Sequence, residues 1–299
     1  MNKLIILILF IISSIIGYYW KSEYDEENKE NFQNKTIKEN YIDIYDKFYS
    51  NIYDQLFKSD IKNEYEIYSL KQYAFDKFNK GSINILDLGC GTGNHIKLLT
   101  KYKYNCVGID RSIKMLNIAR KNNPSVNLIK GDFHNKSTFN KRQFSHIIAL
   151  FYTIYYTDNA EKVFKNLNFW LKPKGFMCIH LIHRDKFDPI LEKSSSLIPL
   201  YNPQKYTDKR NTKTSLEFNN FKYISDWTFN KSDVQFTEHF LFKKKPINRQ
   251  NIHKFTVHKV SYYINLAKKN GFKLVKIIDL SPVNHQYNAI YVFKKLYGY

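Results

Sequence analysis

The sequence predicts an α/β fold with a parallel sheet that is covered by helices on both faces. Between residues 83 and 181, short apolar runs of strand length alternate with amphipathic segments of helical spacing. The apolar runs are nearly continuous, which is typical of strands buried on both faces. Directly after the first run, three of the chain's ten glycines fall within five residues, as expected where a strand turns tightly into a helix.

The elements follow a regular order through the first part of the chain. Aromatic and aliphatic residues at helical spacing predict helices over 41–57 and 64–78, and Gly81-Ser82 then breaks the chain. Ser112 is a suitable N-cap for a later helix, and Pro124 follows the end of that helix. The elements expected next are a strand at 83–88, a helix at 94–101, a strand at 105–109, a helix at 112–122 and a strand at 126–129.

The second part of the chain changes character after residue 184. Before that point, a strand is expected at 146–150, and Asp158 with Glu161 three residues later predicts the start of a helix that ends near Leu171. A strand at 176–181 follows. The remaining expected elements are antiparallel strands at 215–225, 234–242 and 251–258, a helix at 261–270, and a closing strand pair at 272–280 and 289–294.

Composition excludes several classes of protein. Aromatic residues make up 17% of the 299 residues, which excludes disorder throughout the chain. The three cysteines lie inside apolar runs, which indicates buried thiols in a reducing compartment, and no Cys/His cluster has the spacing of a zinc site. The formal charge of +20 favours contact with polyanions at low salt, but the abundance of Lys, Asn, Ile, Tyr and Phe is also what A/T-rich codons produce.

The N-terminal segment predicts a membrane anchor. Residues Leu4 to Trp20 carry no charge, reach the lower length limit of a spanning helix and end in three aromatic residues. A cleaved signal segment within 1–20 is the alternative. The balance of Lys residues weakly places the following bulk of the chain in the cytosol. Residues 21–40 are charged and rich in Asn, so we expect a linker there.

The glycine cluster and two later acids predict a binding site for a nucleoside. Gly89, Gly91 and Gly93 let a ligand approach the backbone closely, and the helix after them offers free N–H groups. Asp87, just before the loop, can accept a hydrogen bond from an ammonium group. Asp110 ends the next strand, where a carboxylate can bind both ribose hydroxyls.

A third strand end completes the predicted site. Asp132 can accept from an adenine amino group while Phe133 lies against the ring. Each piece alone has an ordinary structural explanation, such as a tight turn or a helix cap. Their order along three successive strands favours one shared crevice at the carboxyl edge of the sheet.

In these motifs the sequence resembles the class I S-adenosylmethionine-dependent methyltransferases over about residues 41–183 and 261–294. The matching segments are ILDLGCGTGNH, VGID, GDF and LKPKG. The resemblance implies a Rossmann-like seven-stranded mixed sheet with helices on both faces and a reversed last strand pair. It also implies S-adenosylmethionine as cofactor, with the glycines at its methionine part, Asp110 at the ribose, and Asp132 with Phe133 at the adenine. A nicotinamide-binding loop would instead read Gly-x-Gly-x-x-Gly.

The resemblance also implies how the chain is organised. Residues 41–299 would form the methyltransferase domain, and 184–260 would be an antiparallel β insertion before the last helix and strands that covers the substrate. Phe151, at the end of the fourth strand of the alternation, is expected at the pocket mouth. The sequence there lacks the pattern of enzymes that methylate amino groups of adenine or glutamine, and no Pro-Cys nucleophile for cytosine is present.

The acceptor and any base are less well specified. His180 and His183 end the fifth strand, and either could act as a base beside the acceptor. In the insertion, Glu238, His239, Arg249 and His253 could contact substrate, although a solvated strand face is the favoured interpretation. The leading expectation is a membrane-tethered enzyme for a small or membrane-proximal acceptor. A nucleic-acid methyltransferase and an inactive cofactor-binding scaffold remain alternatives, and the oligomeric state stays open.

Overall fold

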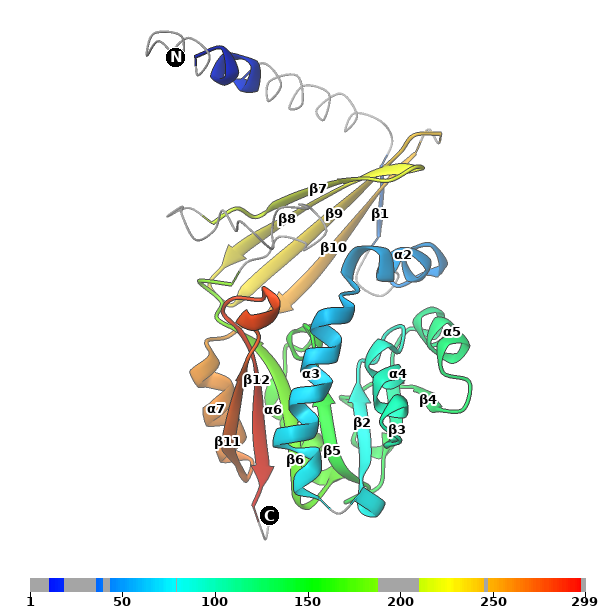
Figure 1. The fold of residues 1–299 in the computed structure, drawn as a ribbon, viewed down its shortest axis with the longest axis vertical. Coiled ribbons are helices and arrows are strands. Elements are labelled where there is room, and N and C mark those ends of the chain that lie inside the picture. Colours follow the sequence, from blue (N-terminus) through cyan, green and yellow to red (C-terminus); the bar gives the residue numbers. More distant parts are fainter. Residues whose placement is uncertain are drawn as a thin grey trace, which may run out of the picture.

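Two sheets organise the protein. The computed structural model describes residues 11–18, 36–39, 44–78, 80–187, 210–244 and 247–296. A seven-stranded sheet with its helices forms the larger layer structure, and a five-stranded sheet lies across one end of it (Figure 1).

The seven-stranded sheet has the predicted mixed architecture. Its strand order is β11-β12-β6-β5-β2-β3-β4. Strands β2 to β6 pair in parallel, and β12 runs antiparallel to both β6 and β11. The strands span Asn84–Leu88 (β2), Asn105–Asp110 (β3), Asn127–Lys130 (β4), Phe144–Ala149 (β5), Leu171–Ile182 (β6), Phe272–Asp279 (β11) and Asn288–Lys295 (β12).

Helices cover both faces of this sheet, as the apolar strands predict. One face packs on α3, α4 and α5, and the other on α6 and α7. In β2, Ile85 packs on the face covered by α3, α4 and α5, and Leu86 packs on the face covered by α6 and α7, because successive strand residues point to opposite faces. The helices span Asp60–Tyr73 (α3), Asn94–Lys101 (α4), Ile113–Asn122 (α5), Ala160–Trp170 (α6) and Val260–Lys269 (α7).

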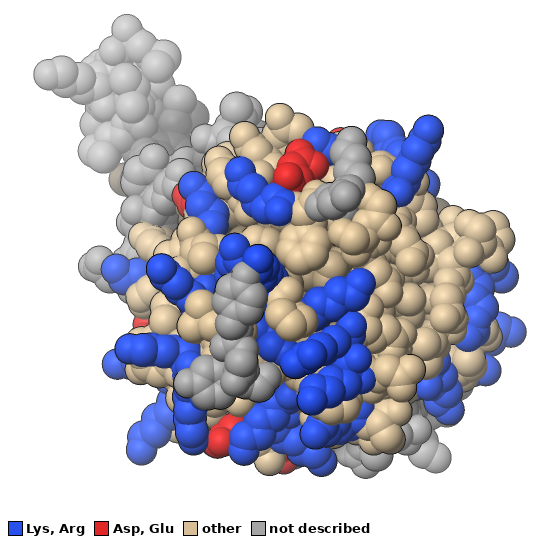
Figure 2. Space-filling model, turned by 90° about the horizontal axis from the view of Figure 1, so that it is seen from below, with Lys and Arg blue, Asp and Glu red and all other residues tan. Residues whose placement is uncertain are grey.

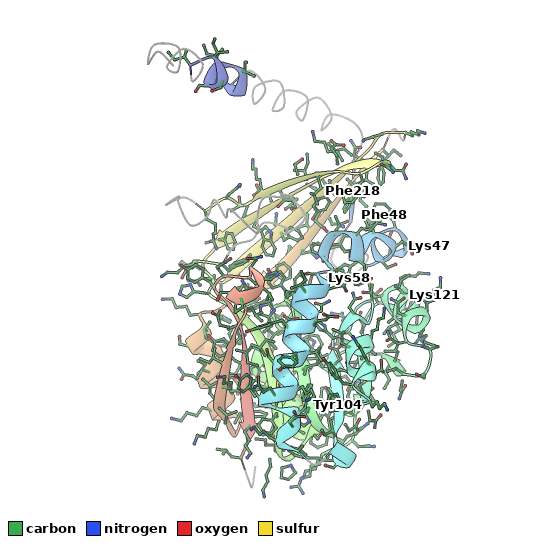
Figure 3. The ribbon with its side chains drawn as sticks, viewed as in Figure 1. Lys47, Phe48, Lys58, Tyr104, Lys121 and Phe218 are labelled. Carbon is green, nitrogen blue, oxygen red and sulfur yellow. The ribbon has the colours of Figure 1, made fainter. Side chains whose placement is uncertain are left out.

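The five-stranded sheet has the order β1-β10-β9-β8-β7. Helix α2 (Lys47–Phe57) packs against it, with Phe48 on the helix (Figure 3). The ring of Phe48 contacts the rings of Phe221, Phe240 and Phe242. The strands span Thr36–Glu39 (β1), Lys213–Glu217 (β7), Phe221–Asn230 (β8), Asp233–Phe242 (β9) and Asn248–Thr256 (β10).

Two expectations for this region need correction. The single strand predicted at 215–225 is interrupted, because residues 219 and 220 form a bend that ends β7 and starts β8. Both positions are Asn, a residue that favours turns. Within the predicted linker, residues 36–39 form β1, which pairs in parallel with β10. A sheet edge offers backbone partners to segments with few apolar side chains.

Three helices begin at other residues than predicted, because other side chains cap their first turns. Helix α2 begins after Asp46 and α3 begins after Ser59, and each of these two side chains accepts a backbone N–H in its helix. Helix α6 is capped by Asn159 rather than by Asp158, because the Asn159 side chain accepts the Lys162 N–H. The predicted Ser112 cap is confirmed, since its hydroxyl accepts the Met115 N–H.

Most of the apolar N-terminal segment lies outside the described residues, apart from the helical residues 11–18. Within the described ranges, no helix combines the length and the apolar character that crossing a bilayer requires.

One end of the molecule is rich in basic side chains. Figure 2 shows Lys and Arg side chains spread over the end of the molecule farthest from the five-stranded sheet, with few acidic side chains among them. The chain's formal charge is +20.

Candidate active site

A cavity of about 760 Å³ lies between the two sheets. Its walls come from the carboxyl ends of β2, β3, β4 and β5, from α2 and the start of α3, and from β8, β9 and β10. This is the crevice position where open parallel sheets bind ligands. One end is lined by the glycine loop and acids, and the other end by aromatic side chains.

The glycine loop needs its glycines for two different reasons. Gly89 and Gly91 line the cavity with φ of +65° and +55°, values that favour glycine. A Cβ on Gly89 would come within 2.7 Å of Thr153 Cγ2. Gly93 is absent from the cavity lining. It precedes α4 with φ +80°, and a Cβ there would come within 2.6 Å of Asn123 Nδ2.

Asp110 lies at the cavity edge and fixes the loop. Its Oδ2 accepts the Gly91 N–H at 2.9 Å, and its Oδ1 accepts the Ser112 N–H at 2.8 Å. Burial raises the pKa of the Asp110 carboxyl, although these backbone donors oppose the shift. The carboxylate keeps lone pairs for a ligand, because each oxygen can accept two hydrogen bonds.

Of the two residues predicted to bind the adenine after β4, only Phe133 lines the cavity. Phe133 lines the cavity, as does Gly131, but Asp132 does not. The Asp132 carboxylate instead meets His134 Nδ1 at 2.7 Å and lies 3.9 Å from Arg111 Nε. Burial acts to raise its pKa, but hydrogen bonds from His134 outweigh burial, so the pKa is lowered.

Asp87 presents an unpaired oxygen at the cavity. The residue is buried, lines the cavity, and its Oδ2 has no hydrogen-bond partner within the described part of the chain. Burial raises the pKa of this carboxyl to about 7. An unpartnered buried carboxylate is costly, and a cationic ligand group would remove that cost. The Asp87 carboxylate therefore fits the ammonium group of S-adenosylmethionine.

An ion-pair network that sequence reasoning missed lies beside Asp87. Lys62 Nζ lies 2.9 Å from Glu66 Oε2, and His95 Nε2 lies at the same distance from that oxygen. Lys62 and Glu66 are both buried, and Lys62 with His95 lines the cavity. Burial acts to raise the Glu66 pKa, but the charge of Lys62 and the His95 hydrogen bond outweigh it and hold the pKa well below its usual range.

Phe151 occupies a strained position at the end of β5. It lines the cavity with φ +54°, a left-handed conformation that bulky side chains rarely adopt. Such strain concentrates at ligand sites, where the surrounding packing enforces it. Lys62 Nζ lies 5.3 Å from the centre of its ring.

The two histidines predicted as bases lie elsewhere. His180 is buried, is absent from the cavity lining, and bonds Asn288 Oδ1 through Nε2 at 3.0 Å. Burial lowers its pKa to about 4. His183 follows β6, is exposed, and also lies outside the lining. Their side chains thus have no access to the cavity from these positions.

The insertion supplies the polar groups at the aromatic end of the cavity. The favoured interpretation of a solvated strand face is wrong for Glu238, Arg249 and His253, which are all buried. Helix α2 covers that face of β9 and β10: Tyr49 Oη lies 3.4 Å from His253 Nε2, and the Arg249 guanidinium is 5.3 Å from the Phe48 ring. His239, which points to the other face, is half-buried.

His253 belongs to a chain of hydrogen bonds that reaches the cavity. Its Nδ1 lies 2.8 Å from Tyr156 Oη, which lies 2.6 Å from Tyr45 Oη. Its Nε2 lies 2.7 Å from Glu238 Oε2. His253, Tyr156 and Tyr45 all line the cavity. Over the described ranges, no group of three His, Cys, Asp or Glu side chains has the arrangement of a metal site.

Comparison with known proteins places the central region in a family. A family model described as a methyltransferase domain matches residues 85–175. The chain is similar to a dTDP-3-amino-3,4,6-trideoxy-alpha-D-glucopyranose N,N-dimethyltransferase of Streptomyces venezuelae, with 32% identity over 80 residues, or 27% of this chain and 33% of the relative. It is also similar to a ubiquinone biosynthesis O-methyltransferase of Rickettsia bellii, with 30% identity over 130 residues, or 42% and 52% of the two chains.

These matches cover only part of the relatives. The chain spans 33% of the Streptomyces protein and about half of the Rickettsia protein. An S-adenosylmethionine-dependent methyltransferase structure from Clostridium acetobutylicum shares the fold, with a TM-score of 0.61, 19% identity and coverage of 83% of this chain and 98% of that one. The CcbJ methyltransferase of Streptomyces caelestis does so with a TM-score of 0.62, 15% identity and coverage of 83% and 96%.

The sheet order with its reversed last strand, the glycine loop at the end of β2 and the domain match agree with one another. Residues 85–175 thus match a methyltransferase domain, and the chain shares the fold of an S-adenosylmethionine-dependent methyltransferase structure.

Proposed function

We propose that this protein transfers a methyl group from S-adenosylmethionine to a small molecule. The observation that carries the proposal is the cavity between the two sheets, in which the strand ends of the seven-stranded sheet face aromatic side chains of β8, β9 and β10. Its volume of about 760 Å³ is within the range of sites for small ligands.

The acid and glycine end of the cavity fits the cofactor. We assign cofactor contacts to Asp87, Gly89, Gly91 and Asp110, and the remaining contacts to Phe133 and Phe151. Bound there, S-adenosylmethionine supplies a methyl group on a positively charged sulfur. The protein's own task is to hold the donor, align the acceptor with it and exclude water.

The aromatic end fits a small acceptor with a ring or an apolar body. Tyr45, Tyr152, Tyr156, Trp227 and Phe255 are among its lining residues. Flat side chains of this kind bury much area and pack on rings. The two relatives are named for a nucleotide-linked amino sugar and for ubiquinone biosynthesis, and both names indicate acceptors of small size.

Basic side chains lie at the cavity as well as elsewhere on the protein. Lys58, Lys62, Arg111, Lys114 and Lys130 line the cavity, and Figure 2 shows further Lys and Arg side chains on the end of the molecule away from the five-stranded sheet. A site for RNA also needs basic side chains beside the pocket, so the nucleic-acid alternative is decided by the transfer assay.

A transfer assay tests the proposal. Purified protein is given S-adenosylmethionine with a tritiated methyl group, together with separate fractions of small metabolites, lipids and RNA. We expect label in the small-molecule or lipid fraction and none in RNA. Label confined to RNA would favour the nucleic-acid alternative, and donor binding by calorimetry without transfer to any fraction would favour a scaffold.

We further propose that residues 4–20 tether the protein to a membrane and that the domain faces the cytosol. The support is the uncharged apolar run and the aromatic residues that follow it. The test is whether the full chain stays with membranes after alkaline carbonate extraction. Glycosylation at Asn34, Asn135 or Asn230, each in an Asn-x-Ser/Thr triplet, would contradict the cytosolic orientation.

A further inference from the structure

We propose that Tyr156, His253 and Glu238 form a proton relay that takes a proton from the methyl acceptor. The inference rests on the proposed function and deepens it, because it assigns an acceptor whose reacting oxygen or nitrogen carries a proton. The three residues come from η4 (Thr153–Tyr156), β10 and β9, so distant parts of the chain meet at one wall of the cavity.

The relay is continuous from the cavity to a buried carboxylate. Tyr156 Oη and His253 Nδ1 are 2.8 Å apart, and His253 Nε2 and Glu238 Oε2 are 2.7 Å apart. Glu238 is 0% exposed and His253 is 1% exposed in the protein. Tyr156 and His253 line the cavity and Glu238 does not, so the carboxylate lies behind the imidazole.

The partners of Glu238 fix the direction of the hydrogen bonds. Tyr223 Oη donates to Glu238 Oε1 at 2.9 Å, and Asn251 Nδ2 donates to Oε2 at 3.0 Å. With His253 Nε2 as a further donor, the carboxylate accepts on both oxygens, which is the arrangement of an ionised acid. His253 then carries its proton on Nε2, and its Nδ1 is free to accept the hydroxyl proton of Tyr156.

A purely structural role does not account for this placement. Arg249 already joins β10 to the segment before α2, because it donates to Asp46 Oδ2 at 2.8 Å and to the Ile44 carbonyl at 2.9 Å. A buried acid and imidazole add little net stability over apolar residues of the same size. Placed at a cavity wall, the same pair can hold an imidazole in one tautomer and stabilise its protonated form.

The chemical step balances without another reagent. The acceptor's lone pair forms a bond to the methyl carbon as the bond from that carbon to sulfur breaks, and the electron pair of the broken bond stays on sulfur. The acceptor loses its proton to Tyr156 Oη while the Tyr156 proton moves to His253 Nδ1. The imidazolium so formed lies against the Glu238 carboxylate, and it releases the proton to solvent after the product leaves.

The relay would assist only acceptors that lose a proton during methyl transfer. Hydroxyl groups and ammonium groups must lose a proton for transfer to finish, so they gain from a base. Thioethers and tertiary amines carry no such proton and would gain nothing. The structure thus assigns a hydroxyl-bearing or amine-bearing small molecule, and the two are distinguished by the atom that carries the label in the isolated product.

The first test uses variants that keep side-chain volume. Glu238→Gln and Tyr156→Phe are assayed with the fraction that accepts label from the native enzyme. We expect kcat to fall about 100-fold or more in each, while the Kd of S-adenosylmethionine in calorimetry changes less than about threefold. His239→Gln on the same strand, with its half-buried ring, is the matched control and should keep native kcat. Native kcat in Glu238→Gln and Tyr156→Phe would overturn the relay.

The second test needs no turnover. Nuclear magnetic resonance of protein with ¹⁵N-labelled histidine reports which ring nitrogen of His253 is protonated. We expect the proton on Nε2 in the native protein and a mixture of tautomers in Glu238→Gln. A proton on Nδ1 in the native protein would overturn the relay even if the variants lose activity. If the native protein labels no fraction, the proposed function fails first, and the relay fails with it.

Discussion

The backbone N–H of Gly91 donates to Oδ2 of Asp110 across 2.9 Å, so one carboxylate joins the glycine loop after β2 to the end of β3. The second oxygen of Asp110 accepts the Ser112 N–H at 2.8 Å, which holds the start of α5 as well. Three backbone segments around the cofactor end of the cavity therefore depend on a single side chain.

Replacing this side chain should weaken binding of the methyl donor. Asp110→Ala removes the acceptor of two backbone N–H groups and the proposed partner of the ribose. We expect the binding free energy of S-adenosylmethionine to fall by about 1–3 kcal/mol, measured by calorimetry. Asp158→Ala changes an exposed acid outside the cavity lining and should leave the Kd unchanged. An unchanged Kd in Asp110→Ala would remove Asp110 from the site.

The close approach of the loop to Thr153 makes a second prediction. Gly89→Ala places a Cβ 2.7 Å from Thr153 Cγ2 at a φ of +65°, so we expect the free energy of unfolding in urea to drop by about 2–4 kcal/mol. Adding Thr153→Ala removes the nearest atoms and should recover part of that loss. Gly81→Ala, where a Cβ would meet no atom within 4 Å, is the control and should change stability little. Equal losses in the first variant and the control would contradict this account.

Much of the fold could be predicted from the sequence, because buried strands appear as apolar runs and their ends are marked by glycines and acids. The apolar runs predicted the parallel strands, and the glycine cluster predicted a loop that the structure places at the cavity. Gly89, Gly91, Asp110 and Asp87 converge there as expected. Asp132 does not line the cavity, because its carboxylate is hydrogen-bonded to His134, two residues later. The spacing of the motif does not reveal that a neighbouring side chain would bind this carboxylate.

The aromatic end of the cavity could not be predicted in the same way. Glu238 and His253 are polar residues in alternating strands, a pattern that normally indicates a solvated face. They are buried because α2, almost 200 positions earlier in the chain, packs over them. A contact between residues so far apart in the chain produces no periodic pattern in the sequence of either segment. The usable signal was the clustering of Tyr45, Tyr49 and Tyr53 at helical spacing, since Tyr49 Oη then lies 3.4 Å from His253 Nε2.

The buried pair of Lys62 and Glu66 should be sensitive to loss of one partner. Lys62→Met leaves the Glu66 carboxylate with His95 as its remaining partner, so we expect the free energy of unfolding to fall by about 3–5 kcal/mol. Lys62→Met with Glu66→Leu removes both charges and should restore most of this loss. Lys165→Met breaks the exposed pair with Glu161 and serves as the control, with an expected change below about 1 kcal/mol. If the double variant is no more stable than Lys62→Met, the ion pair is not what the first variant disturbs.

The same pair predicts how stability responds to acid. The Glu66 pKa is lowered in the folded protein, so its contribution is complete above the pKa of the unfolded chain, near 4.5. As pH falls below that value, the unfolded chain binds a proton that the folded protein resists, and the contribution is lost. Urea unfolding between pH 6 and pH 3 should therefore show a smaller decline in Glu66→Gln than in the native protein. Parallel declines would mean that other carboxylates dominate acid unfolding.

Asp87 predicts the opposite response near neutrality. Burial raises the pKa of the Asp87 carboxyl from 3.8 to about 7, so the folded protein favours the protonated acid. The resulting stability of the ligand-free protein is complete below pH 3.8 and declines as the pH rises to about 7. An ammonium group binds the ionised form, so S-adenosylmethionine should bind roughly tenfold more tightly at pH 7.5 than at pH 6. Binding below pH 7 should release a proton, which calorimetry in buffers of different ionisation enthalpy can count. In Asp87→Asn both the pH dependence and the proton release should disappear, because the orphaned Oδ2 that takes the charge is gone. A Kd that stays flat across this range in the native protein would show that the carboxylate of Asp87 does not meet the donor's ammonium group.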